Sequence, residues 1–256
     1  TITVEGTMDV GDATLSSTGQ GARWGGMHLG SLTSSSIELS ATSILEASPA
    51  LTVSDLGRFT ADGAEFARAS GADTLISIAY GSNATVELSD SQLYDAGSGC
   101  IESFATEGAL HLTDISLATC NGVGLWARQA HLDVDGMALE DGFTHGFELT
   151  AVTGSMTGVN ATNFQGSGYI GWLESVDESF ALSDLNGTVG VLGGLAGANN
   201  RHLNLQTIQI TGAPAVDFDN TAGLIDGLIL NGLGTGTAFA SHHGRSMDSL
   251  IVEGLS

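Results

Sequence analysis

The chain of 256 residues has 29 acidic residues, six arginines and no lysine, and its formal net charge at pH 7 is −23. This excess of negative charge argues against nucleic-acid binding and against docking on anionic membranes, because both depend on cationic side chains. Two interpretations of the charge stay open. The surface is either simply well solvated and self-repelling, or adapted to salt water, which screens that repulsion.

A six-residue phrase, apolar–x–(Asp, Gly or small)–x–x–apolar, recurs along the whole chain. Its copies begin at Val10, Leu39, Ala61, Leu88, Leu112, Val134, Met156, Leu182, Leu205, Ile225 and Met247. The copies follow one another about every 23 residues, a period that indicates a solenoid of stacked repeats. We therefore predict one domain over residues 1–256. Because the chain opens and closes within a repeat, we expect it to be a segment of a larger surface protein.

Each repeat is predicted to form three short strands. The first alternates apolar and polar residues, as in Thr85–Leu88 and His131–Val134, which is the period of a half-buried strand. Turn-forming residues follow, and then a second apolar segment such as Gln92–Leu93. A glycine-rich bend leads to the third strand, predicted to begin at Gly26, Ala50, Leu75, Cys100, Gly124, Gly146, Gly168, Thr188 and Ala215.

Three strands per repeat with no helix between them predict an all-β, single-stranded parallel solenoid of about eleven coils. Strands of successive coils should pair about 4.8 Å apart, and the connections should be right-handed. The interior is predicted to contain Leu88, Leu93, Leu112, Leu117, Val134, Leu139, Leu205, Ile210, Ile225 and Leu230 in aligned columns.

This pattern resembles the right-handed parallel β-helix superfamily of pectate-lyase-like proteins. The segment Ala22–Leu29 (ARWGGMHL) is similar to the Trp-Gly-Gly-aliphatic phrase near the start of many secreted β-helix repeat proteins. The resemblance implies the fold but no single function, since lyases, hydrolases, epimerases, tailspikes and adhesins share it.

The catalytic phrases of the best-known members of that superfamily are absent from the sequence. Polygalacturonases combine Asn-Thr-Asp, Asp-Asp, Gly-His-Gly and Arg-Ile-Lys, whereas this chain has no adjacent Asp pair and no lysine. Its nearest approach is His243-Gly244-Arg245. None of the six arginines lies in a pectate-lyase phrase, which would combine a basic residue with a calcium-binding carboxylate cluster. The sequence therefore disfavours both activities.

The best candidate site lies on the third strands, where alternate residues face outward. One predicted outward row is Thr52, Ile76, Glu102, Trp126, Glu148 and Ile170, and the row beside it is Phe104, Arg128, Thr150 and Trp172. Glu102 and Glu148 lie two coils apart, roughly 9.6 Å from the strand spacing, near the separation of inverting glycosidases. The two tryptophans are suited to stacking on sugar rings. The candidate carbohydrate-binding residues are Glu102, Trp126, Arg128, Glu148 and Trp172; the alternative is that these side chains only coat the sheet.

Other polar groups are weaker candidates. The row Glu87–His111–Asp133 and the pair His242-His243 have residue types found in metal or acid–base sites, but no converging pattern. The acidic segments Asp133–Asp135, Val176–Glu178 and Asp217–Asp219 predict at most weak calcium binding, and we expect no other cofactor. Asn83, Asn160 and Asn186 fit the N-glycosylation pattern and favour a secreted chain.

The two cysteines are predicted to be free, buried thiols. Aligning Leu88 with Leu112 places Cys120 beside Ala96, four columns from Cys100 in the neighbouring coil. At strand-like rise this separation exceeds the roughly 7 Å between Cα atoms that a disulfide allows, unless the intervening turn bends the chain.

These features predict a non-enzymatic, secreted or cell-surface β-solenoid with a structural or adhesive role. The alternative is a carbohydrate-active enzyme or sugar-binding module that uses the Glu102–Trp126–Glu148 face. Strands at both ends of the chain lead us to expect contact with flanking domains or with further copies stacked end to end into filaments. A polysaccharide is the other expected partner.

Overall fold

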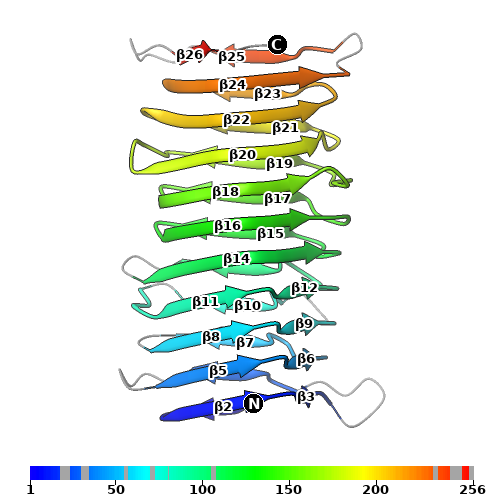
Figure 1. The fold of residues 1–256 in the computed structure, drawn as a ribbon, viewed down its shortest axis with the longest axis vertical. Coiled ribbons are helices and arrows are strands. Elements are labelled where there is room, and N and C mark those ends of the chain that lie inside the picture. The colour runs from blue at the N-terminus through cyan, green and yellow to red at the C-terminus, as the bar shows by residue number, and fades with distance from the viewer. Residues whose placement is uncertain are drawn as a thin grey trace.

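The computed structural model describes residues 1–17, 24–29, 35–54, 57–69, 73–79, 81–104, 108–232, 236–242 and 250–253. Over these residues the secondary structure consists of β-strands without helices, and successive coils pair in parallel. The coils stack along the long axis of the molecule, with the first coil at one end and the last at the other (Figure 1). The predicted parallel β-solenoid of about eleven coils is confirmed.

Two parallel sheets run along the stack. The eleven-stranded sheet contains, in spatial order, β1 (Ile2–Val4), β4 (Met27–Leu29), β7 (Leu51–Val53), β10 (Ile76–Ile78), β13 (Ile101–Ser103), β15 (Val123–Arg128), β17 (His145–Thr150), β19 (Tyr169–Glu174), β21 (Gly193–Ala198), β23 (Val216–Asp219) and β25 (Phe239–His242). We call it the third-strand sheet, because it is built from the predicted third strands.

The fifteen-stranded sheet bends across two sides of the solenoid. Its main path is β2 (Thr7–Gly11), β5 (Ser36–Ser40), β8 (Arg58–Asp62), β11 (Thr85–Ser89), β14 (Ala109–Ala118), β16 (His131–Leu139), β18 (Thr153–Ala161), β20 (Phe180–Thr188), β22 (Leu203–Thr211), β24 (Gly223–Asn231) and β26 (Leu250–Glu253). In the first coils the second predicted strand is separate, as β3 (Thr14–Leu15), β6 (Ser43–Leu45), β9 (Glu65–Ala67) and β12 (Gln92–Tyr94). From β14 onward the two segments form one long strand.

The bend between these two segments falls on the third residue of the six-residue phrase. That residue has a positive φ in successive coils, for example 47° at Asp90, 50° at Asp114 and 81° at Gly136. Glycine reaches this left-handed region without strain and aspartate tolerates it better than most residues. The phrase is therefore the sequence signature of one corner, repeated from coil to coil.

The core is a column of apolar side chains enclosed by the sheets. Of the ten side chains predicted to be interior, nine are buried, and Leu230 is half-buried against the core. Rings stack along the axis as well: Phe143 and Phe164 lie nearly parallel, with centroids 6.2 Å apart. Alternation along each strand and repetition from coil to coil together produce these columns.

Two predicted strand positions are wrong. Residues 188–192 do not form a third strand: Thr188 ends β20, and Val191 and Leu192 lie exposed in the bend before β21. In the last coil, Ile225 pairs with Val252 and not with Met247, which lies outside the described residues. Both errors come from bends of variable length, which shift a strand without changing its apolar pattern.

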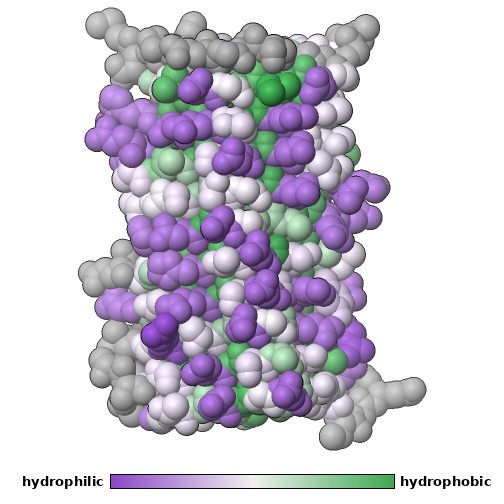
Figure 2. Space-filling model, in the orientation of Figure 1, coloured by the Kyte–Doolittle hydropathy of each residue, from purple (hydrophilic) through white to green (hydrophobic). Residues whose placement is uncertain are grey.

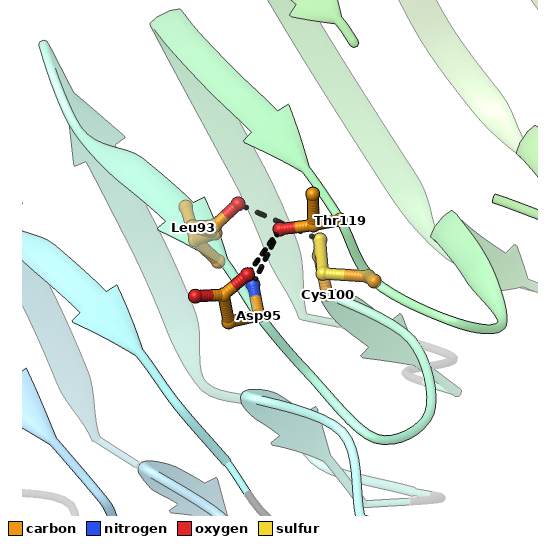
Figure 3. Close-up of a disulfide and its surroundings, with 5 residues drawn as sticks. Leu93, Asp95, Cys100 and Thr119 are labelled. Atoms are coloured by element: carbon orange, nitrogen blue, oxygen red, sulfur yellow. Dashed lines mark hydrogen bonds between the residues drawn. A yellow bond between two sulfur atoms is a disulfide. The ribbon is translucent and has the colours of Figure 1, made fainter. Parts of the chain in front are cut away.

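Cys100 and Cys120 form a disulfide, so the prediction of free thiols is wrong (Figure 3). The predicted register is correct, since Asn121 N donates to Ala96 O, but the chain turns between Ala96 and Cys100. The turn brings the two Cα atoms to 5.7 Å, within disulfide range. Thr119 supports the same corner by donating to Asp95 Oδ1 at 2.6 Å.

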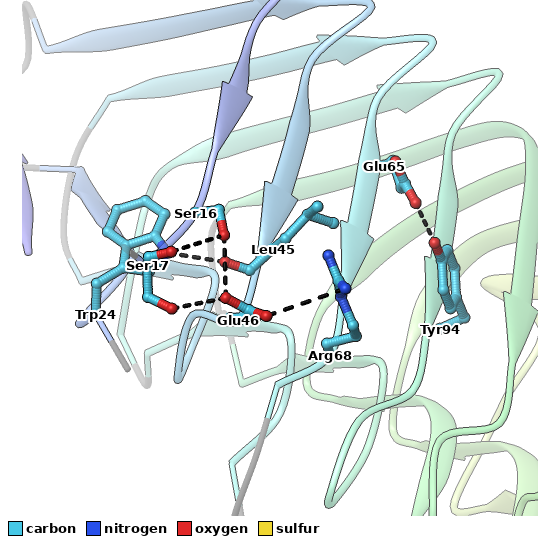
Figure 4. A network of polar contacts seen from close by, with 8 residues as sticks. All are labelled: Ser16, Ser17, Trp24, Leu45, Glu46, Glu65, Arg68 and Tyr94. Carbon is cyan, nitrogen blue, oxygen red and sulfur yellow. Dashed lines mark hydrogen bonds and ion pairs between the residues drawn. The ribbon is translucent and has the colours of Figure 1, made fainter. Parts of the chain in front are cut away.

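Polar contacts hold the corner of the first coils (Figure 4). The indole Nε1 of Trp24, from the Trp-Gly-Gly phrase, donates to Leu45 O at 2.9 Å. The phrase also needs its second glycine, because Gly26 has φ 61° and a Cβ there would collide with the carbonyl oxygen of Pro49. Hydrogen bonds from Ser17 and then Ser16 lower the pKa of Glu46, which also faces Arg68.

The surface charge predicts a salt effect on stability. Hydrophilic side chains are spread over the face of the fifteen-stranded sheet, and no broad apolar area is visible on it (Figure 2). Because −23 charges on one rod repel one another, raising NaCl from low to molar concentration should raise the melting temperature. KCl at equal ionic strength should give the same rise. A melting temperature that stays flat or falls would contradict this expectation.

Candidate functional site

The third-strand sheet carries a row of alternating carboxylates and indoles. Its register places Glu102, Trp126, Glu148 and Trp172 on consecutive coils, from β13 to β19, and all four side chains are half-buried. We call these four residues the Glu–Trp row. Successive members lie one strand spacing apart, about 4.8 Å between backbones.

The predicted rows need two corrections. Trp172 stands in the same row as Glu148, not in the neighbouring one, and Ser77 stands level with Glu102. Ile76 and Ile170, predicted to face outward, are fully buried. Trp172 was misplaced because the bend before β19 is two residues longer than the bends before β15 and β17, whereas Ile76 is one residue from the true outward position, Ser77.

Further aromatic rings extend the row. The Phe104 and Trp126 rings meet edge to face with centroids 5.1 Å apart, and the Arg128 guanidinium lies 6.0 Å from the Phe104 centroid. Arg128 therefore lies beside the row, as predicted. On the other flank, Tyr169 contacts Trp172 at 5.9 Å between centroids.

His145 completes the aromatic surface. Its ring lies parallel to that of Tyr169, with centroids 5.9 Å apart and planes 9° apart. A Cβ on Gly168 would come within 2.6 Å of the His145 ring, so only glycine lets the ring lie flat there. His145 Nδ1 accepts the backbone N–H of Tyr169 at 3.1 Å, and burial lowers the pKa of the imidazole. The neutral ring therefore presents Nε2–H as a donor.

A hollow of about 220 Å³ opens beside Glu102 and Trp126. Its other polar walls are the hydroxyl side chains Thr74, Ser98 and Thr144, and Thr74 donates to Glu102 Oε2 at 3.3 Å. A volume below the usual 300–1,000 Å³ of ligand pockets suits one small ring and not a whole oligosaccharide. Hydroxyls, a carboxylate and an indole face are the groups that bind a sugar ring.

Trp126 and Glu148 are the polar groups of the row that are least well satisfied. Trp126 Nε1 is buried and meets no hydrogen-bond acceptor among the described residues. Burial raises the pKa of the Glu148 carboxyl, repulsion from Glu174 raises it further, and Arg128 partly offsets both. The protein thus holds a carboxylate where its charged form is disfavoured.

Glu148→Gln is therefore expected to stabilise the protein at neutral pH. Because the pKa is raised above the unfolded value of about 4.3, the parent keeps its stability below that pH and suffers a loss as pH rises through the folded pKa. The amide removes it. The melting temperature of the variant should exceed that of the parent at pH 7 and approach it near pH 4. Glu140→Gln, at an exposed site, is the control; a lower melting temperature for Glu148→Gln at pH 7 would refute the argument.

The two carboxylates of the row lie apart from each other. Glu102 and Glu148 are two coils apart, roughly 9.6 Å, and the indole of Trp126 stands between them in the row. Glu102 lines the hollow, whereas Glu148 does not. An inverting glycosidase needs the space between its two carboxyl groups for a water and the scissile bond. In the row, Trp126 occupies the position between Glu102 and Glu148 where that water and bond would have to lie.

The row Glu87–His111–Asp133 lies on the fifteen-stranded sheet in the predicted register. His111 Nδ1 and His131 Nε2 lie 3.2 and 3.1 Å from Asp133 Oδ2, while Glu87 turns away to Arg58 at 2.8 Å. Within the described ranges, no group of three His, Cys, Asp or Glu side chains is arranged to hold a metal ion. The polar side chains of this row therefore contact one another, or Arg58, in pairs at the surface.

The remaining candidates have local partners. Asp177 Oδ1 accepts from Ser179 N and Oγ, which lowers the pKa of its carboxyl, and Asp217 lies 3.4 Å from His242. His243 lies outside the described residues. Asn83, Asn160 and Asn186 are exposed, which a glycan acceptor requires, and their modification stays a prediction.

His145, Tyr169 and the hollow were not predicted from the sequence. Tyr169 and Trp172 do belong to the segment Gly168–Trp172 that marks a third strand, and their three-residue spacing is visible there. The hollow has no such signal, because its walls come from separate coils.

Comparisons with known proteins support the fold alone. No family model matches the chain, and no curated protein matches it. Among solved structures, the enzymatically active domain of tailspike protein 2 of bacteriophage CBA120 is similar, with a TM-score of 0.53 and 12% sequence identity. The match covers 96% of this chain and 43% of the tailspike chain. Across the described part of the chain, no helix has the length and apolarity needed to cross a membrane.

Proposed function

We propose that this chain is an adhesive β-solenoid module that binds an extended polysaccharide along its third-strand sheet. The observation that carries the proposal is the Glu–Trp row, in which indoles and carboxylates alternate on four consecutive coils. Tryptophan supplies an apolar face for stacking on a sugar ring, and carboxylates accept hydrogen bonds from sugar hydroxyls.

The spacing of the row suits a polymer that lies parallel to the solenoid axis. One coil advances by about 4.8 Å, close to the length of one pyranose unit in an extended chain. Rings stacked on Trp126 and Trp172 would then be separated by a ring over Glu148. The hollow beside Glu102 would take the next ring in the direction of the first coils.

Two findings support a role outside the cell. The Cys100–Cys120 disulfide is typical of oxidising compartments. The similar solved structure is the enzymatically active domain of a bacteriophage tailspike protein. We propose binding without cleavage for this chain, because Trp126 separates its two candidate carboxylates.

Screening the protein against a glycan array and by affinity electrophoresis in soluble polysaccharides tests the proposal. We expect at least one extended polysaccharide to retard the parent protein. Trp126→Ala and Trp172→Ala should each weaken binding roughly tenfold or more, as loss of a stacking tryptophan does. Ile229→Ala, which trims a half-buried apolar side chain on the other sheet, should change nothing.

The same samples test for cleavage. Incubation with the bound polysaccharide should release no new reducing ends. Absence of binding to any glycan, or equal binding by both tryptophan variants and the parent, would refute the proposal. Release of reducing ends that depends on Glu102 and Glu148 would replace it with an enzymatic function.

A further inference from the structure

The surroundings of Glu148 point to the chemistry of the sugar, an inference that depends on the proposed function. Glu148 stands between the two indoles of the row, with Trp126 one coil before it and Trp172 one coil after it. The Glu148 side chain is half-buried. A polymer lying on the row would cover it further and remove its remaining water.

The charged groups around Glu148 are mostly negative. Glu174 lies on the next strand, β19, and acts on Glu148 by repulsion, while Arg128 on β15 attracts it. Glu102 lies two coils before it in the row, and Asp217 lies three coils after it. Arg128 is itself exposed and lies over the Phe104 ring, and His145 is neutral. The local field therefore disfavours an anionic ligand.

A neutral sugar over Glu148 would desolvate the carboxylate and return only ordinary hydrogen bonds. An ammonium group would form a charge-assisted hydrogen bond with it and lie against two indole faces, which attract cations. A uronic acid polymer would be repelled by these carboxylates.

We propose that the polysaccharide bound by the Glu–Trp row is an amino-sugar polymer whose free amine lies over Glu148, between Trp126 and Trp172. The amine supplies the counter-charge that the chain's own described residues provide only through Arg128. Stacking on the indoles then orients the ring that carries it.

Calorimetric titration with three hexasaccharides tests this proposal: β-1,4-linked glucosamine, its fully N-acetylated counterpart and oligogalacturonate. The buffer should be about 0.15 M in salt, where charges more than about 8 Å apart are largely screened. The glucosamine hexamer should bind at least about tenfold more tightly than the acetylated one, as expected for a charged hydrogen bond. Oligogalacturonate should not bind.

Two charge-matched variants separate a specific contact from general attraction to an acidic protein. Glu148→Gln should abolish the preference for the free amine, whereas Glu140→Gln, which removes one exposed charge, should leave it intact. Equal losses in the two variants would overturn the proposal. Equal binding of both hexamers by the parent would overturn it too, while leaving glycan binding intact. If no glycan binds in this assay or on the array, the proposed function falls as well.

Discussion

Replacing Leu112 by aspartate is expected to abolish cooperative folding. Leu112 is 1% exposed and pairs in register with Leu88 before it and Val134 after it, so the new carboxylate would lie in the apolar column. Burying an unpaired charge costs several kcal/mol, and protonation relieves only part of that cost. Domains are typically stable by about 5–15 kcal/mol, so one such change removes much of the margin. Thermal unfolding followed by circular dichroism should show no native transition.

Two further variants make this expectation falsifiable. Thr113→Asp changes the adjacent, exposed residue of β14 and should leave the melting temperature nearly unchanged, because its side chain faces solvent. Leu112→Ala should fold but lose about 2–5 kcal/mol through the cavity it leaves. If Leu112→Asp melts within a few degrees of the parent, the register of the core is wrong.

The sequence alone predicts the inner face of the fold because its repeat carries two constraints at once. Residues such as Leu88 and Leu112 must be buried, and the third residue of each phrase must bend the chain, as Asp90 and Asp114 do with φ near 50°. These constraints act within a few neighbouring residues. Burial and corner position together fix the register of the first strand in each coil, apart from the last.

The outer face is harder to predict, because nothing local fixes the length of the bend before each third strand. Glu102, Trp126 and Glu148 were aligned correctly, since their bends are of matching length. The bend before β19 has a different length. Trp172 was therefore predicted in the neighbouring row, whereas the structure places it in the Glu–Trp row. The fourth member of the alternating row thus becomes known only from the three-dimensional pairing.

The disulfide, at a corner of the solenoid, is a second feature that could not be predicted from the alignment of the strands. The columns of Cys100 and Cys120 are four residues apart. If those residues were extended as in a strand, the distance between the two Cα atoms would be too long for a disulfide. The corner at Asp95, where φ is 56°, folds the intervening residues back and brings the two Cα atoms to 5.7 Å. A register deduced from strands does not describe distances across a turn.

Loss of this disulfide is expected to have the second-largest effect on stability. The bond links residues 20 positions apart, and closing a loop of that size stabilises a protein by about 3 kcal/mol in the chain-entropy model. The double variant Cys100→Ala, Cys120→Ala should therefore unfold at clearly lower urea concentration than the parent. Alanine is the suitable replacement because both sulfurs are buried, and a serine hydroxyl would lack a partner there.

Reductant distinguishes loss of the bond from loss of packing. Unfolding the parent in urea with dithiothreitol should move its midpoint toward that of the double variant, because the bond is reduced once the chain opens. The variant itself should not respond to dithiothreitol. If the oxidised parent and the double variant unfold at the same urea concentration, the bond contributes nothing to the fold. A shift of the variant on adding reductant would show that the effect has another cause, since the sequence contains only these two cysteines.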